Sequence, residues 1–257
     1  MDQPALEEHL TDLKLAAAVQ DALLTADLPQ CRCGRLVLRN RMSNHVGGDF
    51  YHVRPLGDDQ LVFAIGDVAG HGIGAALVMA LILGYLRQDT PHTRRPSALL
   101  AQINELLLAL GRRTDSFITC SLFYGIVDLP TGIVIYVNAG HPHPLLCHRT
   151  DANLTFLPPT TMLLGVQQAP SAEACHQFRR HDRLILYTDG ITEAASPQAR
   201  QFGHQNLESL IRANPQLPPE QLADAIFAAL DDHTRRNDPA DDQTLAIIDF
   251  DHTAPSI

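Results

Sequence analysis

VFAIGDVAGHG, residues 62–72, brings an apolar run to an aspartate and then into a glycine-rich turn. The β-branched and aromatic residues before Asp67 predict a buried strand that ends at this carboxylate. Gly70 and Gly72 allow the backbone to turn sharply and to approach a ligand closely. The apolar run that follows is shorter than the roughly 20 residues of a membrane span, so we expect a buried helix over residues 73–88.

Around this stretch, predicted strands come in antiparallel runs and predicted helices gather in separate blocks. Residues 117–140, FITCSLFYGIVDLPTGIVIYVNAG, predict a hairpin with a DLPTG turn. Further strands are expected within 35–56 (broken by Gly47-Gly48), 57–70, 143–149, 154–159, 183–190 and 243–251, and further helices over 5–25, 96–110, 204–213 and 218–235. This order predicts an α+β fold in which sheet packs on sheet with helices outside, not a parallel doubly wound sheet.

One domain of catalytic size accounts for most of the chain. The sequence shows no internal repeat, no low-complexity tract and no convincing linker after residue 30. We therefore expect an N-terminal helical segment over residues 1–28 and a single domain over residues 29–252.

The net charge of the chain indicates which classes of ligand and partner it would attract or repel. Of 257 residues, 19 are Lys or Arg and 29 are Asp or Glu, which gives a formal net charge of −10. Such a field repels phosphate backbones, so a nucleic-acid partner is not expected, whereas divalent cations are attracted. A generally acidic surface explains the same number.

The cysteine content indicates a reducing compartment. Five cysteines make an odd count without a CxxC pair, which disfavours a disulfide framework or a zinc site. They are Cys31, Cys33, Cys120, Cys147 and Cys175. The N-terminus lacks a basic region followed by an apolar stretch, so no signal peptide is predicted. We expect a cytoplasmic protein with no membrane span.

Acidic residues stand at four predicted strand ends. They are Asp49 in VGGDFY, Asp67 in AIGDVAGHG, Asp189 in LYTDGITEA, and the pair Asp241 and Asp242 in DPADDQTLAII. Carboxylates that share a cleft repel one another and titrate upward unless a cation lies among them. Hard oxygen ligands of this kind suit Mg²⁺ or Mn²⁺.

Two interpretations of these carboxylates remain open at this point. Two ions bridged by one aspartate and one water would supply a hydroxide nucleophile at neutral pH and would clamp a phosphoryl oxygen. Alternatively, Asp and Gly are simply common turn formers. The sequence alone does not show that the four places converge.

Five motifs, in this order, resemble the metal-dependent protein serine/threonine phosphatases of the PPM type (type 2C-like), and specifically their bacterial SpoIIE/RsbU branch. The motifs are VGGDFY, GDVAGHG, NAGHPHPLL, LYTDGITEA and DDQTLAIIDF, and the resemblance covers residues 30–250. It implies a β-sandwich of two antiparallel sheets flanked by helices on both sides, a four-layer αββα arrangement. It also implies a site for two Mn²⁺ or Mg²⁺ ions at one end of the sandwich.

The resemblance assigns ligand roles residue by residue. Asp67 matches the aspartate that bridges both ions, and Val68 matches the position that lends a backbone carbonyl. Asp49 matches an acid that binds one ion directly or through water. Asp189 and Asp241 match the remaining ligands of the other ion.

The first acid of the DDQT pair is the family's ligand, so Asp241 is assigned over Asp242. The implied mechanism is a one-step, in-line attack on phosphorus by a water that the two ions activate, with the Ser or Thr alkoxide leaving. It needs no phosphoenzyme and therefore no nucleophilic cysteine.

Two departures from the type 2C pattern leave the general acid unassigned. The histidine that those enzymes place directly in an Asp-Gly-His run stands four residues after Asp67, at His71, so its role does not transfer. The arginine that grips phosphate has no clear match, since Arg39 and Arg41 are suggested by position alone.

Other residues near the motifs admit structural roles. His141 in NAGHPHP is expected to shape a turn with its ring hydrogen-bonded to backbone, rather than to bind metal or transfer a proton. Asn138 is expected to orient the same loop. Thr188 and Thr192 flank Asp189 and are candidates to hold its carboxylate, or else they are ordinary β-branched strand residues.

The N-terminal helix also has two interpretations. It caps the sandwich, or it resembles the AxxVQxxLL helix that in this family connects a sensor or receiver domain to the phosphatase and switches it. In the second case it is also a candidate for homodimer contacts.

The resemblance implies dephosphorylation of a phosphoserine or phosphothreonine protein, usually an anti-sigma-factor antagonist, in partner-switching control of transcription or stress response. An alternative is a catalytically weak or inactive phosphatase fold that acts by protein–protein binding. A two-metal enzyme acting on small phosphate esters shares the same chemistry. Because Asp49, Asp67, Asp189 and Asp241 are all present, we favour the protein phosphatase.

Overall fold

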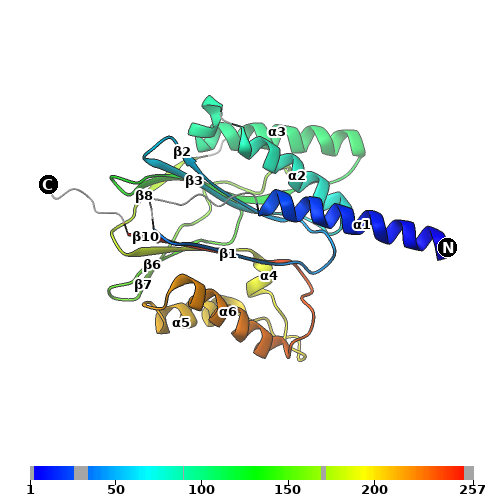
Figure 1. Cartoon of the computed structure of the whole chain (residues 1–257). Coiled ribbons are helices and arrows are strands. Elements are labelled where there is room, and N and C mark those ends of the chain that lie inside the picture. The colour runs from blue at the N-terminus through cyan, green and yellow to red at the C-terminus, as the bar shows by residue number, and fades with distance from the viewer. Residues whose placement is uncertain (1–2, 26–33, 89, 169–171, 252–257) are drawn as a thin grey trace.

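The fold is a four-layer sandwich, seen here in a computed structural model that describes residues 3–25, 34–88, 90–168 and 172–251 (Figure 1). Two five-stranded antiparallel sheets lie face to face. Helices α2 (Ile73–Arg87) and α3 (Pro96–Thr114) cover one sheet, and α5 (Gly203–Ala213) and α6 (Pro219–Thr234) cover the other. The predicted αββα sandwich is therefore confirmed.

Each sheet draws its strands from distant parts of the sequence. Sheet A has the order β1 (Leu36–Arg41), β10 (Gln243–Phe250), β9 (Asp182–Tyr187), β6 (Leu145–His148), β7 (Asn153–Phe156). Sheet B has the order β2 (Asp49–Leu56), β3 (Gln60–Val68), β4 (Cys120–Asp128), β5 (Ile133–Ala139), β8 (Ala174–Gln177). Their central strands are covered on both faces, which is why they are apolar almost throughout and not alternating.

Three apolar clusters hold the layers together. The cluster between the sheets contains the stacked rings of Phe63, Phe123 and Tyr136, and the contact between Phe178 and Phe250. A second cluster lies between sheet B and α2 with α3, and a third between sheet A and α5 with α6. Both sheets are thereby fixed relative to each other, which fixes the loops at their shared ends.

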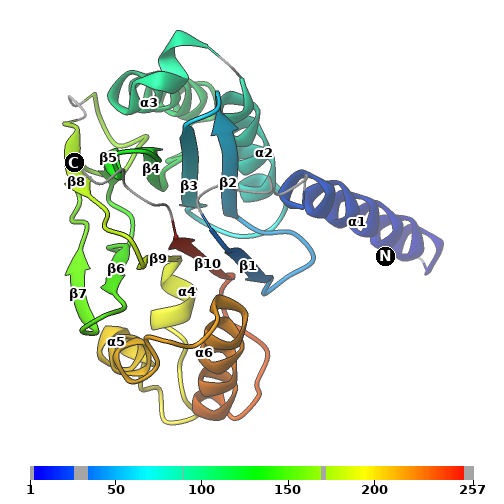
Figure 2. The same cartoon turned by 60° about the vertical axis from the view of Figure 1, so that its left-hand side comes forward.

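Helix α1 (Gln3–Leu24) lies beside the sandwich and projects away from it (Figures 1 and 2). Its last turns contact the domain, where Leu24 is buried. The amide of Gln20 is also buried: its Nε2 donates to the Gly47 carbonyl and its Oε1 accepts from the Gly47 N–H, both at 3.1 Å. The helix expected over residues 5–25 is confirmed.

Several boundaries differ from the expectation. Helix α3 was expected to end at residue 110 but continues to Thr114. Its C-cap residue, Asp115, has left-handed backbone angles, and the N–H groups of Asp115 and Ser116 both donate to the Gly111 carbonyl. The short helix α4 (Asp189–Thr192) begins where a strand was expected to end in a loop, and the edge strand β8 and the 3₁₀ turn η1 (Pro91–Arg94) were not anticipated.

The described cysteines are free thiols, Cys120 and Cys147 buried and Cys175 exposed, while Cys31 and Cys33 lie outside the described residues. Over the described ranges, no helix has the length and apolar character needed to cross a bilayer.

Candidate metal centre

Two predicted ligands face each other across a strand pair. Asp49 begins β2 and Asp67 stands near the end of β3, and the register of this antiparallel pair places them directly opposite. Opposite residues of such a pair have Cβ atoms about 5 Å apart, and like charges there are destabilising. Sheet B thus presents two carboxylates at one point of its end, an arrangement that calls for a counter-charge.

Sheet A contributes the other two predicted ligands to the same end. Asp189 follows β9 as the first residue of α4, and Asp241 stands two residues before β10. Figure 2 shows α4 beside the ends of β9 and β10. Both carboxylates act electrostatically on Asp67, so the four acids lie around one cleft between the sheets.

The pKa values of these carboxyl groups are all raised. Burial, followed by the charges of Asp189 and Asp241, raises the pKa of Asp67 to about 8. Burial and then the charge of Asp67 raise the pKa of Asp49 well above its usual range. Burial is likewise the largest cause of the raised pKa values of Asp189 and Asp241. Crowded carboxyls of this kind are stabilised as anions by a cation.

Threonine hydroxyls from the opposite sheet orient Asp49. Its Oδ2 accepts hydrogen bonds from Thr188 Oγ1 at 2.7 Å and from Thr244 Oγ1 at 2.6 Å. Asn40 supports Thr244 with a further bond of 2.7 Å. Both threonines are fully buried, and Asp49 is 1% exposed. With Oδ2 doubly engaged, Oδ1 is the oxygen left for an ion.

Thr188 therefore holds Asp49 and not Asp189, contrary to one of the two roles considered for it. The reason is that β9 and β2 belong to opposite sheets, so the side chain of Thr188 crosses the interface between them. Thr192 does contact Asp189, but its hydroxyl donates to the backbone carbonyl of Asp189, at 3.2 Å, and not to the carboxylate.

Asp242 serves the scaffold. Its Oδ1 accepts from the backbone N–H and the hydroxyl of Ser43 at 2.8 and 2.9 Å, and its Oδ2 accepts from the Gly48 N–H at 3.1 Å. Asp241 is exposed, and its Oδ1 accepts the N–H of Asp242. Both oxygens of Asp242 are thus engaged by hydrogen bonds, whereas within the described part of the chain only Oδ1 of Asp241 is, which supports the choice of Asp241 over Asp242 as the ligand.

The two glycines of VGGD make room for this arrangement. A Cβ on Gly47 would lie 1.7 Å from Asp242 Oδ2. A Cβ on Gly48 would lie 2.4 Å from the Val68 carbonyl oxygen and 3.0 Å from Asp67 Oδ1. Side chains at either position would therefore displace a predicted ligand or its support, which explains the Gly-Gly dipeptide physically.

The donor set fits hard divalent cations in its chemistry. It consists of aspartate carboxylates and a backbone carbonyl, the oxygen ligands that Mg²⁺ and Mn²⁺ take. In the described residues, however, no three His, Cys, Asp or Glu side chains already converge on one point at ligand distances. A centre for two ions, which lie about 3.5–4 Å apart, spreads its ligands over a wider space than a single-ion site does, and the mutual electrostatic effects of the acids agree with such a spread.

Three further residues considered from the sequence are placed by the structure. Arg39 and Arg41 point to α6, where they pair with Asp224 at 3.5 Å and Asp231 at 2.6 Å. Neither is therefore placed to grip phosphate in the cleft. His71 is exposed, and its charge lowers the pKa of Asp241, which opposes the larger effect of burial.

The NAGH loop is ordered by its own side chains. Asn138 Oδ1 accepts the His141 N–H at 2.8 Å, and its Nδ2 donates to the Leu157 carbonyl at 3.3 Å, so the loop-orienting role of Asn138 is confirmed. The His141 ring bonds to a side chain, Ser121 Oγ at 2.9 Å, and the backbone of Tyr187, a partner of the kind expected, also acts on it.

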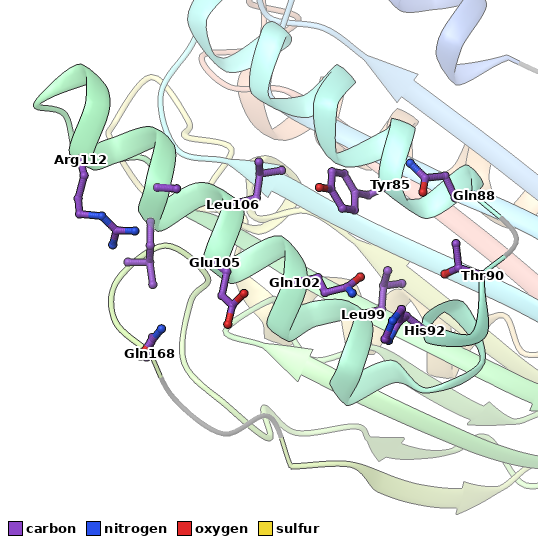
Figure 3. A pocket seen from close by; sticks show the side chains of 12 residues that line it. Tyr85, Gln88, Thr90, His92, Leu99, Gln102, Glu105, Leu106, Arg112 and Gln168 are labelled. Carbon is purple, nitrogen blue, oxygen red and sulfur yellow. The ribbon is translucent and has the colours of Figure 1, made fainter.

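Two hollows are each lined by one of the predicted ligands, and a third is not. One of about 550 Å³ lies beside Asp189 and is lined by Tyr187, Glu193 and His204 among others. Another, of about 710 Å³ and mostly apolar, begins at Val68 and runs along α2. A third, of about 760 Å³, lies between α2 and α3 with Tyr85 and Glu105 in its wall (Figure 3). It is lined by none of the predicted ligands and is therefore separate from the metal centre.

Sequence signals for the supporting residues were weak. Thr244 stands in DDQTL and Asn40 in LRNRM, both ordinary strand sequences. Only the register of β1 against β10, which pairs Asn40 with Thr244, shows that they meet. Gln20 is likewise one of several polar residues on α1.

Comparison with known proteins gives consistent matches. The model of the Stage II sporulation protein E (SpoIIE) family matches residues 57–251. Protein IcfG of Synechocystis sp. is 28% identical over 92% of this chain and 41% of its own length. Phosphoserine phosphatase RsbU of Bacillus subtilis is 28% identical over 87% of this chain and 66% of its own. The chain thus spans about two fifths to two thirds of these curated relatives.

A solved structure agrees with the fold. The SiaA-PP2C domain of Pseudomonas aeruginosa superposes with a TM-score of 0.83 at 20% identity, covering 96% of this chain and 99% of that one. At this identity the likeness establishes the fold alone.

Proposed function

Because this chain belongs to the SpoIIE family, we propose that it is a metal-dependent protein serine/threonine phosphatase. One observation carries the proposal: Asp49 and Asp67 face each other on neighbouring strands, with Asp189 and Asp241 acting on Asp67 from the other sheet. An acidic cleft of this kind would itself repel a phosphorylated substrate. It becomes a phosphate site only when cations occupy it.

The cofactor in this proposal is a pair of Mn²⁺ or Mg²⁺ ions. Asp67 would hold both ions, Asp189 and Asp241 would complete one site, and Asp49 would serve the other. The Val68 carbonyl would lend a further backbone oxygen. When bound, the ions supply an activated water and neutralise charge on the phosphoryl oxygens. Thr188 and Thr244 fix the orientation of Asp49, and Asp242 fixes the loop that leads into it.

No covalent intermediate on the protein is needed. Of the three cysteines that the structure describes, Cys120 adjoins the candidate site: it pairs with Val68 across β3 and β4 and is 1% exposed. Burial and then the charge of Asp67 raise the pKa of Cys120 well above its usual range, so it stays a neutral thiol. A neutral, buried thiol is a poor nucleophile.

The proposed substrate is a phosphoserine or phosphothreonine protein of the anti-sigma-factor antagonist class. The similar protein RsbU is named a phosphoserine phosphatase, which supports this substrate chemistry. The implied setting is partner-switching control of transcription or stress response in the bacterial cytoplasm. The five cysteines without a disulfide pattern support that compartment.

Within this proposal, residues 1–28 form a linker or switch segment and residues 29–252 form the phosphatase domain. Leu15 and Val19 on α1 are 65% and 53% exposed. Such apolar residues would suit contacts with a second copy or with an upstream sensor or receiver domain.

The second candidate is an inactive phosphatase fold that works by protein contact. It is favoured less because the full set of four carboxylates is present and is backed by dedicated hydrogen bonds to Asp49. A fold that had lost catalysis would have no reason to retain four mutually repelling acids, of which Asp49 is fully buried, because they are costly to stability.

Hydrolysis of p-nitrophenyl phosphate and of a phosphoserine-bearing antagonist domain tests the function. The assay uses about 2 mM Mn²⁺ or Mg²⁺, a concentration suited to weak carboxylate sites, and a parallel set with EDTA. We expect metal-dependent turnover that Asp67→Asn abolishes while the fold survives. Bound metal without turnover on either substrate would favour the binding module.

A further inference from the structure

His141 is a buried histidine that lies at the junction of the two sheets. It is 1% exposed, and its Nδ1 is 2.9 Å from Ser121 Oγ. Ser121 belongs to β4 and is the register partner of Asp67 on β3. One side of the ring is therefore fixed to the strand that neighbours the predicted bridging ligand.

The other side of the ring faces the end of β9. With Nδ1 engaged by Ser121, Nε2 is the free nitrogen, and it has no hydrogen bond of good geometry among the described residues. Burial lowers the pKa of the ring, whereas the backbone of Tyr187 raises it. A group that favours the protonated ring is an acceptor, so the Tyr187 carbonyl is the group that Nε2 faces. Tyr187 precedes Asp189 by two residues.

The protonation of the ring follows from these neighbours. Burial lowers the pKa of His141 to about 3, so the ring is neutral and carries one proton. A proton on Nε2 points to the Tyr187 carbonyl, and Nδ1 then accepts the hydroxyl proton of Ser121. The ring thus offers one donor to sheet A and one acceptor to sheet B.

We propose that His141 is a positioning residue that sets the separation of Asp67 and Asp189 across the two sheets, and thereby the affinity of the cleft for its divalent ions. The inference rests on the metal centre of the proposed function. His141 touches neither ion nor substrate in this account: it acts through Ser121 and β3 on one side, and through Tyr187 and α4 on the other.

The backbone of His141 makes the ring a firm spacer. Its N–H donates to Asn138 Oδ1 at 2.8 Å, and Asn138 is fully buried and bonded to the Leu157 carbonyl. The ring therefore cannot follow a movement of one sheet without straining the loop. Groups that orient metal ligands in this indirect way typically change metal affinity about 10–100-fold when removed.

Manganese binding by isothermal titration calorimetry tests the proposal without any need for turnover. We expect His141→Ala to weaken Mn²⁺ binding at least about tenfold. We expect His141→Gln to recover most of the affinity, because an amide again offers one donor and one acceptor.

His52→Ala is the matched control for the loss of a buried ring. His52 is 8% exposed, and its Nε2 has no hydrogen-bond partner in the part of the chain that the structure describes. It pairs with Ala64 inside sheet B, three residues from Asp49. The His52→Ala variant should have a lower melting temperature, as His141→Ala does. Its Mn²⁺ dissociation constant should stay within about twofold of the wild-type value, because His52 supports no ligand across the sheets.

Wild-type affinity in a folded His141→Ala protein would overturn the proposal. If that variant does not fold, Ser121→Ala decides, because it removes only the hydroxyl: several-fold weaker binding supports the spacer, and unchanged binding overturns it. Wild-type protein that binds Mn²⁺ but hydrolyses nothing would contradict the proposed function and leave this inference standing.

Discussion

At the scale of single residues, the cleft is built from groups that oppose one another. Asp49 and Asp67 stand in register on adjacent strands, and burial leaves little water to separate their charges. Folding brings them together because the apolar strands around them gain more than the acids lose. This crowding keeps a proton on Asp67 in the metal-free protein, and a cation that binds there would replace the proton and favour the ionised carboxylates.

The protonation of Asp67 should make the metal-free protein less stable as the pH rises. Its pKa is about 8 in the folded protein against 3.8 for the ordinary group. Below pH 4 the group is protonated in both states. Between pH 4 and 8 the unfolded chain loses this proton while the folded protein retains it, so stability falls across that window.

Asp67→Asn should remove this part of the pH dependence. We expect urea unfolding in EDTA to show the variant gaining at least about 1 kcal/mol over wild type between pH 5 and pH 8, with Mn²⁺ reducing the difference. Parallel pH profiles for the two proteins in EDTA would contradict the crowding of charge at Asp67.

Gly47→Ala tests the space that the loop reserves for Asp242. The added Cβ would overlap Oδ2 and displace a carboxylate that accepts three hydrogen bonds. We expect a loss of at least about 2 kcal/mol in chemical denaturation. Gly84→Ala is the control, because a Cβ there meets nothing within 4 Å and helix propensity should stabilise α2 by up to about 1 kcal/mol.

At the scale of elements, one buried ion pair joins neighbouring strands of sheet A. Arg183 on β9 is fully buried and contacts both oxygens of Asp249 on β10, at 2.6 and 2.9 Å. Arg183 also donates to the Leu217 carbonyl at 2.9 Å, which ties the loop before α6 to the sheet. The pair thus aligns the two strands whose far ends lead to Asp189 and Asp241.

Breaking this pair should be costly. Asp249→Asn leaves Arg183 buried without its counter-charge, and we expect a loss of about 3–5 kcal/mol in urea unfolding. The exposed pair of Arg39 and Asp224 provides the comparison, because Asp224→Asn should change stability by less than about 1 kcal/mol. Equal losses of stability in the two variants would mean that burial does not explain the effect of Asp249→Asn.

Most elements followed from local sequence pattern. The hairpin of β4 and β5, the helices α2, α5 and α6, and the final strand β10 were anticipated because apolar periodicity and turn residues agree there. Strand β8 was missed because ACHQ has neither length nor alternating polarity. Helix α4 was missed because DGIT has the composition of a turn.

The candidate site was anticipated only as far as its acids. Glycine next to aspartate at a strand end marks Asp67 and Asp189 locally, whereas the partners of those acids depend on packing between sheets. Thr188 illustrates the limit: its place beside Asp189 in the chain suggested one contact, and the sandwich gives it another, with Asp49.

At the scale of the whole molecule, α1 is joined to the metal centre through one residue. Gln20 holds both backbone groups of Gly47, Gly48 donates to Asp242, and Asp49 follows directly. A displacement of α1 along its axis would therefore pull on the segment that carries a predicted ligand.

Gln20→Ala should uncouple the helix from the centre. We expect several-fold lower phosphatase activity and weaker Mn²⁺ binding. The melting temperature should fall by several degrees, because one pair of hydrogen bonds contributes about 1–3 kcal/mol. Gln3→Ala is the control, because Gln3 is the first residue of α1 and stands at the helix end opposite to Gln20. A Gln20→Ala protein with full activity and affinity would show that α1 is a passive cap.

The grip of Gln20 on main-chain atoms has an evolutionary consequence. Gln20 contacts only the N–H and the carbonyl of Gly47, so the contact does not depend on which side chains neighbour it. Gly47 itself is required because a Cβ there would meet Asp242. Under the proposed function, a different segment ahead of the helix would therefore change how the domain is regulated without requiring any change in the residues of the metal centre.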